Sequence, residues 1–300
     1  MPQQSATVIA TYSRRMRLRL ESGEVVKARI KGKRIKPVCG DFVQAEPIEN
    51  ESDWLINSID ERQNELTRPN MRGQIEVLAA NIDTLVVVAS VSPLPDWFIV
   101  DRYLCAAELM GVSPILIFNK IDLLAGHGIT IPELQEYRDI GIPVFECSAE
   151  KGKGIRKLRK ALSGQRTIVV GQSGVGKSSL INKLIDESQQ RTANISSKTG
   201  EGKHTTVNSV MIPLKSGGTI IDSPGVRDYA PALSASSDAA WGFREIREAS
   251  EACRFANCRH LREPGCAVKA GVEAETISYR RYESYKRVVN LTERLAEGKY

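Results

Sequence analysis

The 300-residue sequence predicts a chain of three parts: an N-terminal β-barrel, a central α/β domain with a mainly parallel sheet, and a small C-terminal α-helical module that binds metal. Three patterns support this division. Short strand patterns fill residues 1–67, strand and helix patterns alternate over 68–232, and three cysteines and a histidine gather within 233–300. With 41% hydrophobic residues, the chain can bury one sizeable core and one or two smaller ones.

The first part is defined by five short strand patterns. They are expected at residues 7–12, 16–20, 25–30, 41–46 and 54–59. Five strands in so short a segment favour a small closed barrel. Residues 14–36 also hold ten Lys or Arg against two Glu. Such a patch is either a solvated face or a site for a polyanion, and the second interpretation requires a fold that binds nucleic acid.

The central part alternates strand and helix, which is typical of a parallel sheet covered by helices on both faces. Ligands of such sheets bind at the carboxyl ends of the strands. The expected strands lie at 82–89, 113–119, 143–147, 167–170 and 219–221, and the expected helices at 97–110, 132–140, 155–162 and 179–184. The helix at 155–162 is notably basic.

A phosphate-binding loop follows the strand at 167–170. Its sequence has the spacing G-x-x-x-x-G-K-S, in which glycines allow consecutive backbone N–H groups to wrap an anion at the start of a helix. Lys177 is expected to reach the β- and γ-phosphates, and the Ser178 hydroxyl to ligate Mg²⁺. The predicted phosphate-binding residues are Gly171, Gln172, Ser173, Gly174, Val175, Gly176, Lys177, Ser178 and Ser179.

The base is expected to be guanine. Upstream of the phosphate-binding loop, the strand at 113–119 leads into the motif Asn119-Lys120-Ile121-Asp122. Guanine presents N1–H and N2–H₂ as adjacent donors that the Asp122 carboxylate can accept, whereas adenine would leave that charge buried and unpaired. Asn119 would brace the base-binding loops, and the Lys120 stem would lie along the ring. The next strand ends in Ser148-Ala149, whose backbone N–H groups could meet guanine O6. GTP and GDP are therefore the predicted ligands.

Two further segments fit the loops that sense the γ-phosphate. Asp222 opens the motif D-x-P-G after a strand and would hold the Mg²⁺ shell, while the Gly225 N–H would meet the γ-phosphate. Residues 202–206 form a polar loop that resembles a mobile switch. Thr206 is the expected Mg²⁺ ligand in this loop, and Thr205 is the alternative.

The residue that would position the attacking water differs from that of Ras-type GTPases. Ras-type enzymes place a glutamine after D-x-x-G, but here the residue is Val226, which can neither donate nor accept a hydrogen bond. His204, beside the switch threonines, is the nearest group able to orient water near neutral pH. The alternative is a surface histidine without a catalytic role.

Along the chain, the base-reading motifs come first, the phosphate-binding loop second and the two switch segments last. This order is a circular permutation of the usual GTPase order. With the cysteine cluster after the switches, it resembles the family of GTPases that depend on the small ribosomal subunit, known as RsgA, YjeQ or EngC. The resemblance rests on residues 119–122, 171–180, 202–206, 222–225 and 253–266, with weaker matches at 39–43 and 101–104; Val207 departs from the family's threonine run.

This resemblance implies specific properties. The barrel would be an OB-fold that binds RNA, and the protein would bind the small (30S) ribosomal subunit and its rRNA during late maturation. GTP hydrolysis to GDP and phosphate would be slow alone and stimulated by that subunit. The resemblance also assigns a catalytic role to the histidine at the position of His204.

The C-terminal part contains Cys253, Cys258, His260 and Cys266 within a short segment. Three thiolates and one imidazole suit a tetrahedral, structural Zn²⁺ without an open position, and free thiols are the alternative. Metal binding would supply folding energy that so small a core lacks. A helix is expected at 273–295, with its tyrosines used for packing.

We expect a cytoplasmic monomer that binds neither membrane nor DNA, because the sequence has no run of 18 apolar residues and no signal pattern. The motifs alone support a GTPase with two flanking modules that bind RNA or protein. Two alternatives stay open at this point: a non-catalytic, GTP-gated RNA-binding scaffold, and a GTPase acting on another RNA or RNP. A GTP-dependent RNA-modifying enzyme is disfavoured, because no second catalytic constellation is visible.

Overall fold

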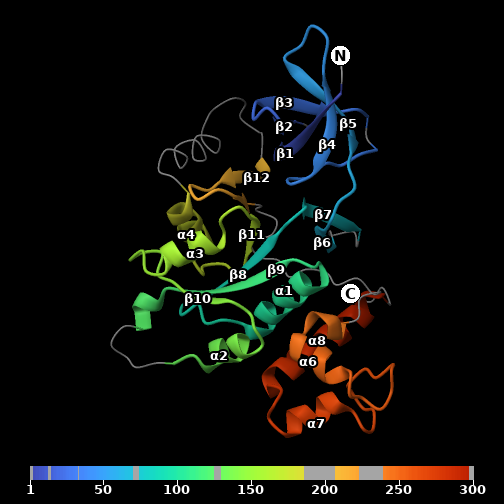
Figure 1. Ribbon diagram of the computed structural model, residues 1–300, viewed down its shortest axis with the longest axis vertical. Coiled ribbons are helices and arrows are strands. Elements are labelled where there is room, and N and C mark those ends of the chain that lie inside the picture. The colour runs from blue at the N-terminus through green and yellow to red at the C-terminus, as the bar shows by residue number, and fades with distance from the viewer. Residues whose placement is uncertain are drawn as a thin grey trace.

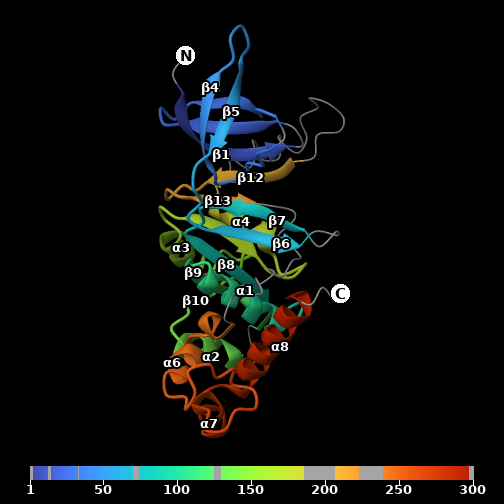
Figure 2. The ribbon, with the colours of Figure 1, turned by 90° about the vertical axis from the view of Figure 1, so that its right-hand side faces the viewer.

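The computed structural model describes residues 3–12, 15–32, 34–69, 74–124, 130–185, 207–222 and 239–296. Three parts follow one another along the long axis (Figures 1 and 2). The barrel lies at one end, the α/β domain in the middle and the small helical module at the other end. No helix within the described residues combines the length and the apolar character needed to cross a membrane.

The N-terminal barrel is confirmed. It is built from β1 (Gln4–Tyr12), β2 (Met16–Leu20), β3 (Val25–Ile30), β4 (Phe42–Pro47) and β5 (Asp53–Ile59). β1 pairs with both β2 and β4, so the order β1-β2-β3-β5-β4 closes on itself. Alternate residues point inward, and Val8, Leu18, Ala28, Val43 and Ile56 are fully buried in the barrel core.

The central domain has a five-stranded parallel sheet in the order β10-β9-β8-β11-β13. Its strands are β8 (Thr84–Ser90), β9 (Ser113–Asn119), β10 (Val144–Glu146), β11 (Arg166–Val170) and β13 (Thr219–Asp222). The strands that read the base precede the phosphate-loop strand β11 in the chain, as the predicted permutation requires.

Helices cover both faces of this sheet. α1 (Trp97–Leu109) and α2 (Pro132–Asp139) pack on one face, and α3 (Ile155–Ala161) and α4 (Lys177–Leu184) on the other. The continuous apolar sequence of β8 requires cover on both faces. Leu85 and Val87 point into the core under α1 and α2, whereas Val86 and Val88 point into the core under α3 and α4. A short 3₁₀ turn, η1 (Ile121–Leu124), follows β9.

Three strands were not predicted. β6 (Glu65–Pro69) and β7 (Ile75–Ala80) form an antiparallel hairpin that runs across residue 67, where the sequence predicts the end of the barrel. β12 (Val207–Pro213) pairs antiparallel with β13 on one side and with barrel strand β1 on the other. The barrel and the central sheet therefore form one continuous eleven-stranded sheet.

The C-terminal module contains the 3₁₀ turn η3 (Ala239–Gly242) and the helices α6 (Arg244–Ser250), α7 (Ala267–Glu273) and α8 (Tyr279–Ala296). The predicted last helix is confirmed, but it begins at Tyr279 rather than at residue 273, since Glu275 adopts a positive φ of 57°. The module's core, including Phe243, Ile246 and Val288, also packs against Cys105 and Ala106 of α1.

Candidate nucleotide-binding site and metal centre

The predicted nucleotide-binding residues meet at one edge of the parallel sheet. Asn119 ends β9, Gly171 directly follows β11, and Asp222 ends β13. Ser148 and Ala149 follow β10, so all these residues lie at the carboxyl ends of neighbouring strands. The structure thus brings together the base-reading and phosphate-binding motifs that the permuted sequence separates.

Asn119 joins the two loops. Its side chain is 1% exposed; Nδ2 donates to the Val175 carbonyl at 2.9 Å, and Oδ1 accepts the Ala149 N–H at 3.1 Å. One buried amide therefore fixes the distance between the phosphate loop and the Ser148-Ala149 loop. Because both ends of the Asn119 amide are hydrogen-bonded, replacing this residue would leave a buried backbone group without its partner and lower the stability of the site.

Asp122 carries a buried acceptor. Within the described part of the chain, its Oδ1 atom is buried and has no hydrogen-bond partner. A buried carboxylate oxygen without a donor is unfavourable, so the site fits a ligand that supplies N–H groups. Guanine N1–H and N2–H₂ meet that need, whereas the adenine edge presents an acceptor instead.

Lys120 and the loop after β8 add contacts that the sequence did not predict. Lys120 Nζ donates to the carbonyls of Ser92 and Gly174 at 2.5 and 2.7 Å. Gln172 Oε1 accepts the backbone N–H of Asp96 at 3.0 Å, so the loop before α1 rests against the phosphate loop. The sequence offered one signal for this contact, the position of the loop. Residues 91–96 are rich in proline and follow the carboxyl end of a buried strand, where ligands of such sheets bind.

The phosphate loop depends on its glycines. Gly171, Gly174 and Gly176 have φ values of 139°, 78° and 93°. A Cβ at Gly171 would lie 2.2 Å from the Val88 carbonyl oxygen, and one at Gly176 would lie 2.4 Å from Asn119 Nδ2. These positions need glycine both for backbone angle and for space.

The rest of the loop presents its polar groups. Lys177 Nζ donates to the carbonyls of Gly171 and Gln172 at 2.7 Å each, and Val175 anchors the loop in the core. Ser173, Ser178 and Ser179 are exposed. Ser178 lies in the first turn of α4, where helix N–H groups favour anions. Ser178 and Asp222 suit an Mg²⁺ ion that accompanies a nucleotide.

Several predicted residues lie outside the described residues. These are His204, Thr205, Thr206 and Gly225, together with Val226. The predicted water-positioning role of His204 and the choice between Thr205 and Thr206 as Mg²⁺ ligand therefore stay predictions.

The four predicted metal ligands form a compact cluster. The ligand atoms of Cys253, Cys258, His260 and Cys266 all lie within 4.8 Å of one another. The His260 Nδ1 atom is 3.5 Å from the sulfur atoms of both Cys253 and Cys266, and those two sulfur atoms are 3.9 Å apart. A tetrahedral zinc site with ordinary Zn–S and Zn–N bonds has edges of about 3.6 to 3.8 Å, so the donor set fits that ion.

Helix α8 supports the ligand loop. The Tyr282 hydroxyl donates to the His260 carbonyl at 2.6 Å, and the Tyr285 hydroxyl donates to the Arg259 carbonyl at 2.9 Å. Both rings are buried, which confirms the predicted packing role for these two tyrosines. Tyr279, in contrast, is 66% exposed.

Glu263 closes the same loop. Its carboxylate accepts backbone N–H groups of Arg259, Leu261 and Arg262 at 2.9 to 3.0 Å. Desolvation opposes ionisation, but these donors outweigh it and lower the pKa of Glu263 to about 2. The carboxylate therefore stays ionised and holds three peptide N–H groups on either side of His260.

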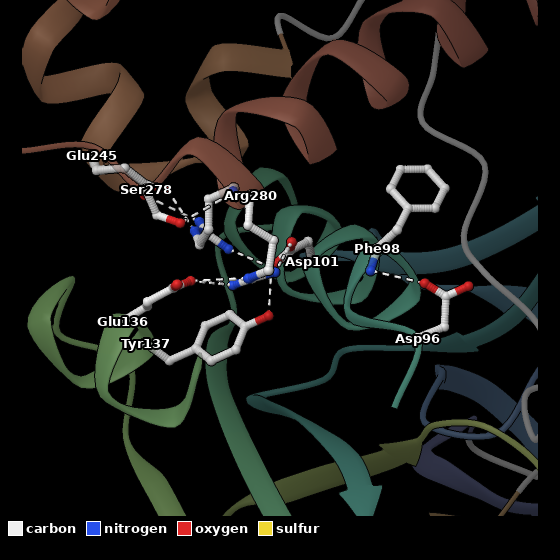
Figure 3. A network of polar contacts seen from close by, with 9 residues as sticks. Asp96, Phe98, Asp101, Glu136, Tyr137, Glu245, Ser278 and Arg280 are labelled. Atoms are coloured by element: carbon white, nitrogen blue, oxygen red, sulfur yellow. Dashed lines mark hydrogen bonds and ion pairs between the residues drawn. The ribbon is translucent and has the colours of Figure 1, made fainter. Parts of the chain in front are cut away.

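A buried charge network attaches the metal-binding module to the central domain (Figure 3). Asp101 of α1 is fully buried and accepts hydrogen bonds from the Tyr137 hydroxyl at 2.6 Å, from Arg280 at 2.8 Å and from Arg281 at 2.7 Å. Arg281, 2% exposed, also binds the Glu245 carboxylate. Burial and the Asp101 charge raise the pKa of Tyr137 well above its usual value.

Comparisons with known proteins agree with this geometry. Residues 59–231 match the family model described as RsgA GTPase. The chain is 37% identical to the small ribosomal subunit biogenesis GTPase RsgA of Shewanella oneidensis, over 96% of this chain and 83% of that protein. The crystal structure of YjeQ from Thermotoga maritima superposes with a TM-score of 0.72 at 26% identity, covering 98% of this chain and 99% of that one. The crystal structure of YloQ, a circularly permuted GTPase, gives the same TM-score and identity, covering 100% and 97%. The chain therefore belongs to the RsgA GTPase family.

Proposed function

We propose that this protein binds the small ribosomal subunit and hydrolyses GTP during maturation of that subunit. The observation that carries the GTP assignment is the meeting of the phosphate loop with the buried, unpartnered Asp122 oxygen at one sheet edge. The subunit assignment rests on the relatives, which are named for biogenesis of the small ribosomal subunit.

In the proposed reaction, water attacks the γ-phosphorus, the bond to the β,γ-bridging oxygen breaks, and GDP and phosphate are released. Lys177 would place its ammonium on the β- and γ-phosphates, exchanging its present loop carbonyls for phosphate oxygens. Mg²⁺, held through Ser178, Asp222 and Thr206, would neutralise phosphate charge. His204 would orient the attacking water.

The barrel offers a surface for RNA. Along β2 and β3, inward apolar residues alternate with outward cations, and Arg17 lies opposite Lys27 in the antiparallel register. Arg17, Lys27 and Arg29 are exposed. Such a face would bind phosphate groups of rRNA rather than read bases, since it lacks aromatic side chains.

The ion in the cysteine cluster would be Zn²⁺ in a structural role, because the three thiolates and one imidazole fill a tetrahedron. We further propose that residues 1–67, 68–232 and 233–300 act as an RNA-binding barrel, a GTPase domain and a zinc module in a cytoplasmic monomer. In this division, both flanking modules would contact the subunit.

GTP turnover with purified ribosomal subunits tests the proposal. We expect stimulation by small subunits and none by large subunits at equal concentration. Stimulation by neither would remove the ribosomal assignment and leave a GTPase for another RNA. Binding of small subunits that depends on GTP, but without turnover, would favour a non-catalytic scaffold.

Two variants separate the roles of single residues. His204→Ala should lower stimulated turnover by about 100-fold or more with nucleotide affinity retained; unchanged turnover would exclude His204 as the water-positioning group. Asp122→Asn should weaken GTP binding by about 100-fold or more and improve binding of xanthosine triphosphate, whose C2 carbonyl can accept from the amide. Equal preference for GTP in this variant and in the wild type would contradict the guanine-reading role.

A further inference from the structure

The helices on one face of the central sheet have an unusual charge composition. Of the α-helices that the structure describes, α3 and α4 alone contain no Asp or Glu within their bounds. They pack side by side and bury Leu158 and Leu180 in the same core. The face that they present to solvent is therefore cationic.

The exposed cations are arranged on a rigid support. Ile155 and Leu158 point into the core, which turns Arg156, Lys157 and Lys160 outward. Arg159 NH2 donates to the Lys183 carbonyl at 2.8 Å, so the exposed Lys183 of α4 lies next to α3. The preceding loop extends this surface with the exposed residues Lys151 and Lys153.

Within the described part of the chain, these charges lack acidic partners. Among the described residues, Arg156, Lys157, Lys160 and Lys183 form no ion pair, and Glu150, which pairs with Lys151, is the only acidic residue in the segment 150–162. The opposite face of the sheet differs, because α1 and α2 contain acidic residues and Arg138 is paired with Glu146. Uncompensated like charges repel one another, so this cluster is more costly to maintain than a mixed surface.

The distribution of charge along the chain supports a specific role. Residues 150–162 hold six Lys or Arg against one Glu, and residues 14–36 hold ten against two, whereas the whole chain carries only +6. The rest of the chain is thus net acidic, and the positive charge is concentrated on the barrel and on α3 with its loop. The metal-binding module covers the α1 and α2 side and leaves α3 and α4 open.

We infer that the α3–α4 face, defined by Arg156, Lys157, Lys160 and Lys183, is a second surface that binds the phosphate backbone of RNA. Ammonium and guanidinium groups on short rigid helices suit phosphate oxygens. No large hydrophobic side chain of α3 or α4 is exposed, so the face lacks the anchors that a membrane or an apolar peptide would require. The inference rests on the proposed function in taking the small subunit as the source of RNA.

A charge-removal variant of the full chain tests this surface. Arg156→Ala, Lys157→Ala and Lys160→Ala together keep good helix formers at exposed positions and leave the nucleotide site untouched. The matched control, Arg156→Lys with Lys157→Arg and Lys160→Arg, retains every charge. Affinity for purified small subunits is measured between 50 and 300 mM salt, with unstimulated GTP turnover as a test of folding.

We expect the alanine variant to bind small subunits about tenfold more weakly and to lower the slope of log affinity against log salt by about two, because each lost phosphate contact lowers it by about 0.7 to 0.9. The charge-retaining control should bind like the wild type. Equal affinity and slope for wild type and alanine variant would overturn the inference.

A short RNA duplex and polyglutamate of matched charge complete the experiment. If the wild type fails to bind subunits at all, the proposed function fails, and the duplex then decides the inference: weaker duplex binding by the alanine variant supports it, and equal binding overturns it. Displacement of the duplex by polyglutamate as effectively as by RNA would overturn the assignment to RNA in favour of an acidic protein.

Discussion

The barrel and the metal-binding module are attached to the central domain by different kinds of interaction. The barrel joins through its main chain, since β1 pairs with β12 at Ala10 opposite Val210 and Tyr12 opposite Val207. The metal-binding module joins through side chains, above all the buried Asp101 carboxylate between Arg280 and Arg281. Backbone pairing tolerates many sequences, whereas a buried charge network fails when one partner is removed.

The two junctions also contact different parts of the nucleotide site. β12 begins directly after Thr206, the predicted Mg²⁺ ligand, and pairs with β13, which ends at Asp222. The network lies on α1, and the loop before α1 contacts the phosphate loop through the Gln172 side chain. The barrel is therefore attached beside the segments expected to respond to the γ-phosphate. The metal-binding module is attached through α1, whose preceding loop contacts the phosphate loop.

The largest effect is expected at the charge network. Arg281→Ala would leave the Asp101 and Glu245 carboxylates buried without their shared cation and should lower the free energy of unfolding by about 3–5 kcal/mol. Denaturant unfolding measures this change. Arg294→Ala, at an exposed position of the same helix, is the control and should change stability by less than about 0.5 kcal/mol. Equal losses in the two variants would show that the network does not hold the module.

A smaller effect is expected where the barrel loop at Gly40 packs against the end of β7. Gly40 has a φ of 98°, and a Cβ there would lie 2.1 Å from the Ala80 carbonyl oxygen, so Gly40→Ala should cost about 2–4 kcal/mol. Gly23 has a similar φ of 88° but open space around it, and Gly23→Ala should cost only about 1 kcal/mol. The difference between the two thermal unfolding curves isolates the cost of the close contact with Ala80. A Gly23 variant as unstable as the Gly40 variant would assign the whole effect to backbone angle.

Gly242 sharpens the comparison on the other side. A Cβ at this position would lie 2.2 Å from Cys105 Sγ of α1, so Gly242→Ala should push η3 from α1 and cost about 1–3 kcal/mol. Cys105→Ala removes the nearest atom and should restore part of that loss in the double variant. Additive losses in the double-mutant cycle would contradict a direct contact.

The smallest effect concerns pH. The pKa of Glu263 is lowered from 4.5 to about 2, so its contribution to the stability of the ligand loop is present above about pH 4.5 and is lost as the pH falls toward 2. Glu263→Gln should therefore release the metal a few-fold faster than wild type at pH 6, measured with a chelating dye. The difference should narrow below pH 4.5. A constant ratio across this range would exclude the carboxylate charge as the cause.

Local patterns were enough to predict much of this fold. Alternation of apolar and polar residues predicted all five barrel strands. The positions of Asn119 and Gly171 at the ends of expected strands predicted the sheet edge where the nucleotide motifs meet. The cysteine spacing predicted a cluster that the structure assembles. These features depend on residues close in sequence, and local periodicity encodes them.

Contacts between distant segments could not be predicted. The pairing of β1 with β12 joins residues about 200 positions apart and is made by backbone groups that every residue has. Asp101 has the sequence character of a solvated helix residue, because its partners Arg280 and Arg281 lie some 180 positions later. Such sites require knowledge of which faces meet.

Hydrogen exchange with and without a metal chelator tests the contrast between the two junctions most directly. Chelation should remove protection from residues 244–296, because the metal-binding module depends on its ligand loop and on side-chain contacts. Protection of β1 and β12 should be unchanged, since their backbone pairing does not involve the module. Loss of protection in β1 and β12 upon chelation would contradict the account and would show that the two junctions depend on each other.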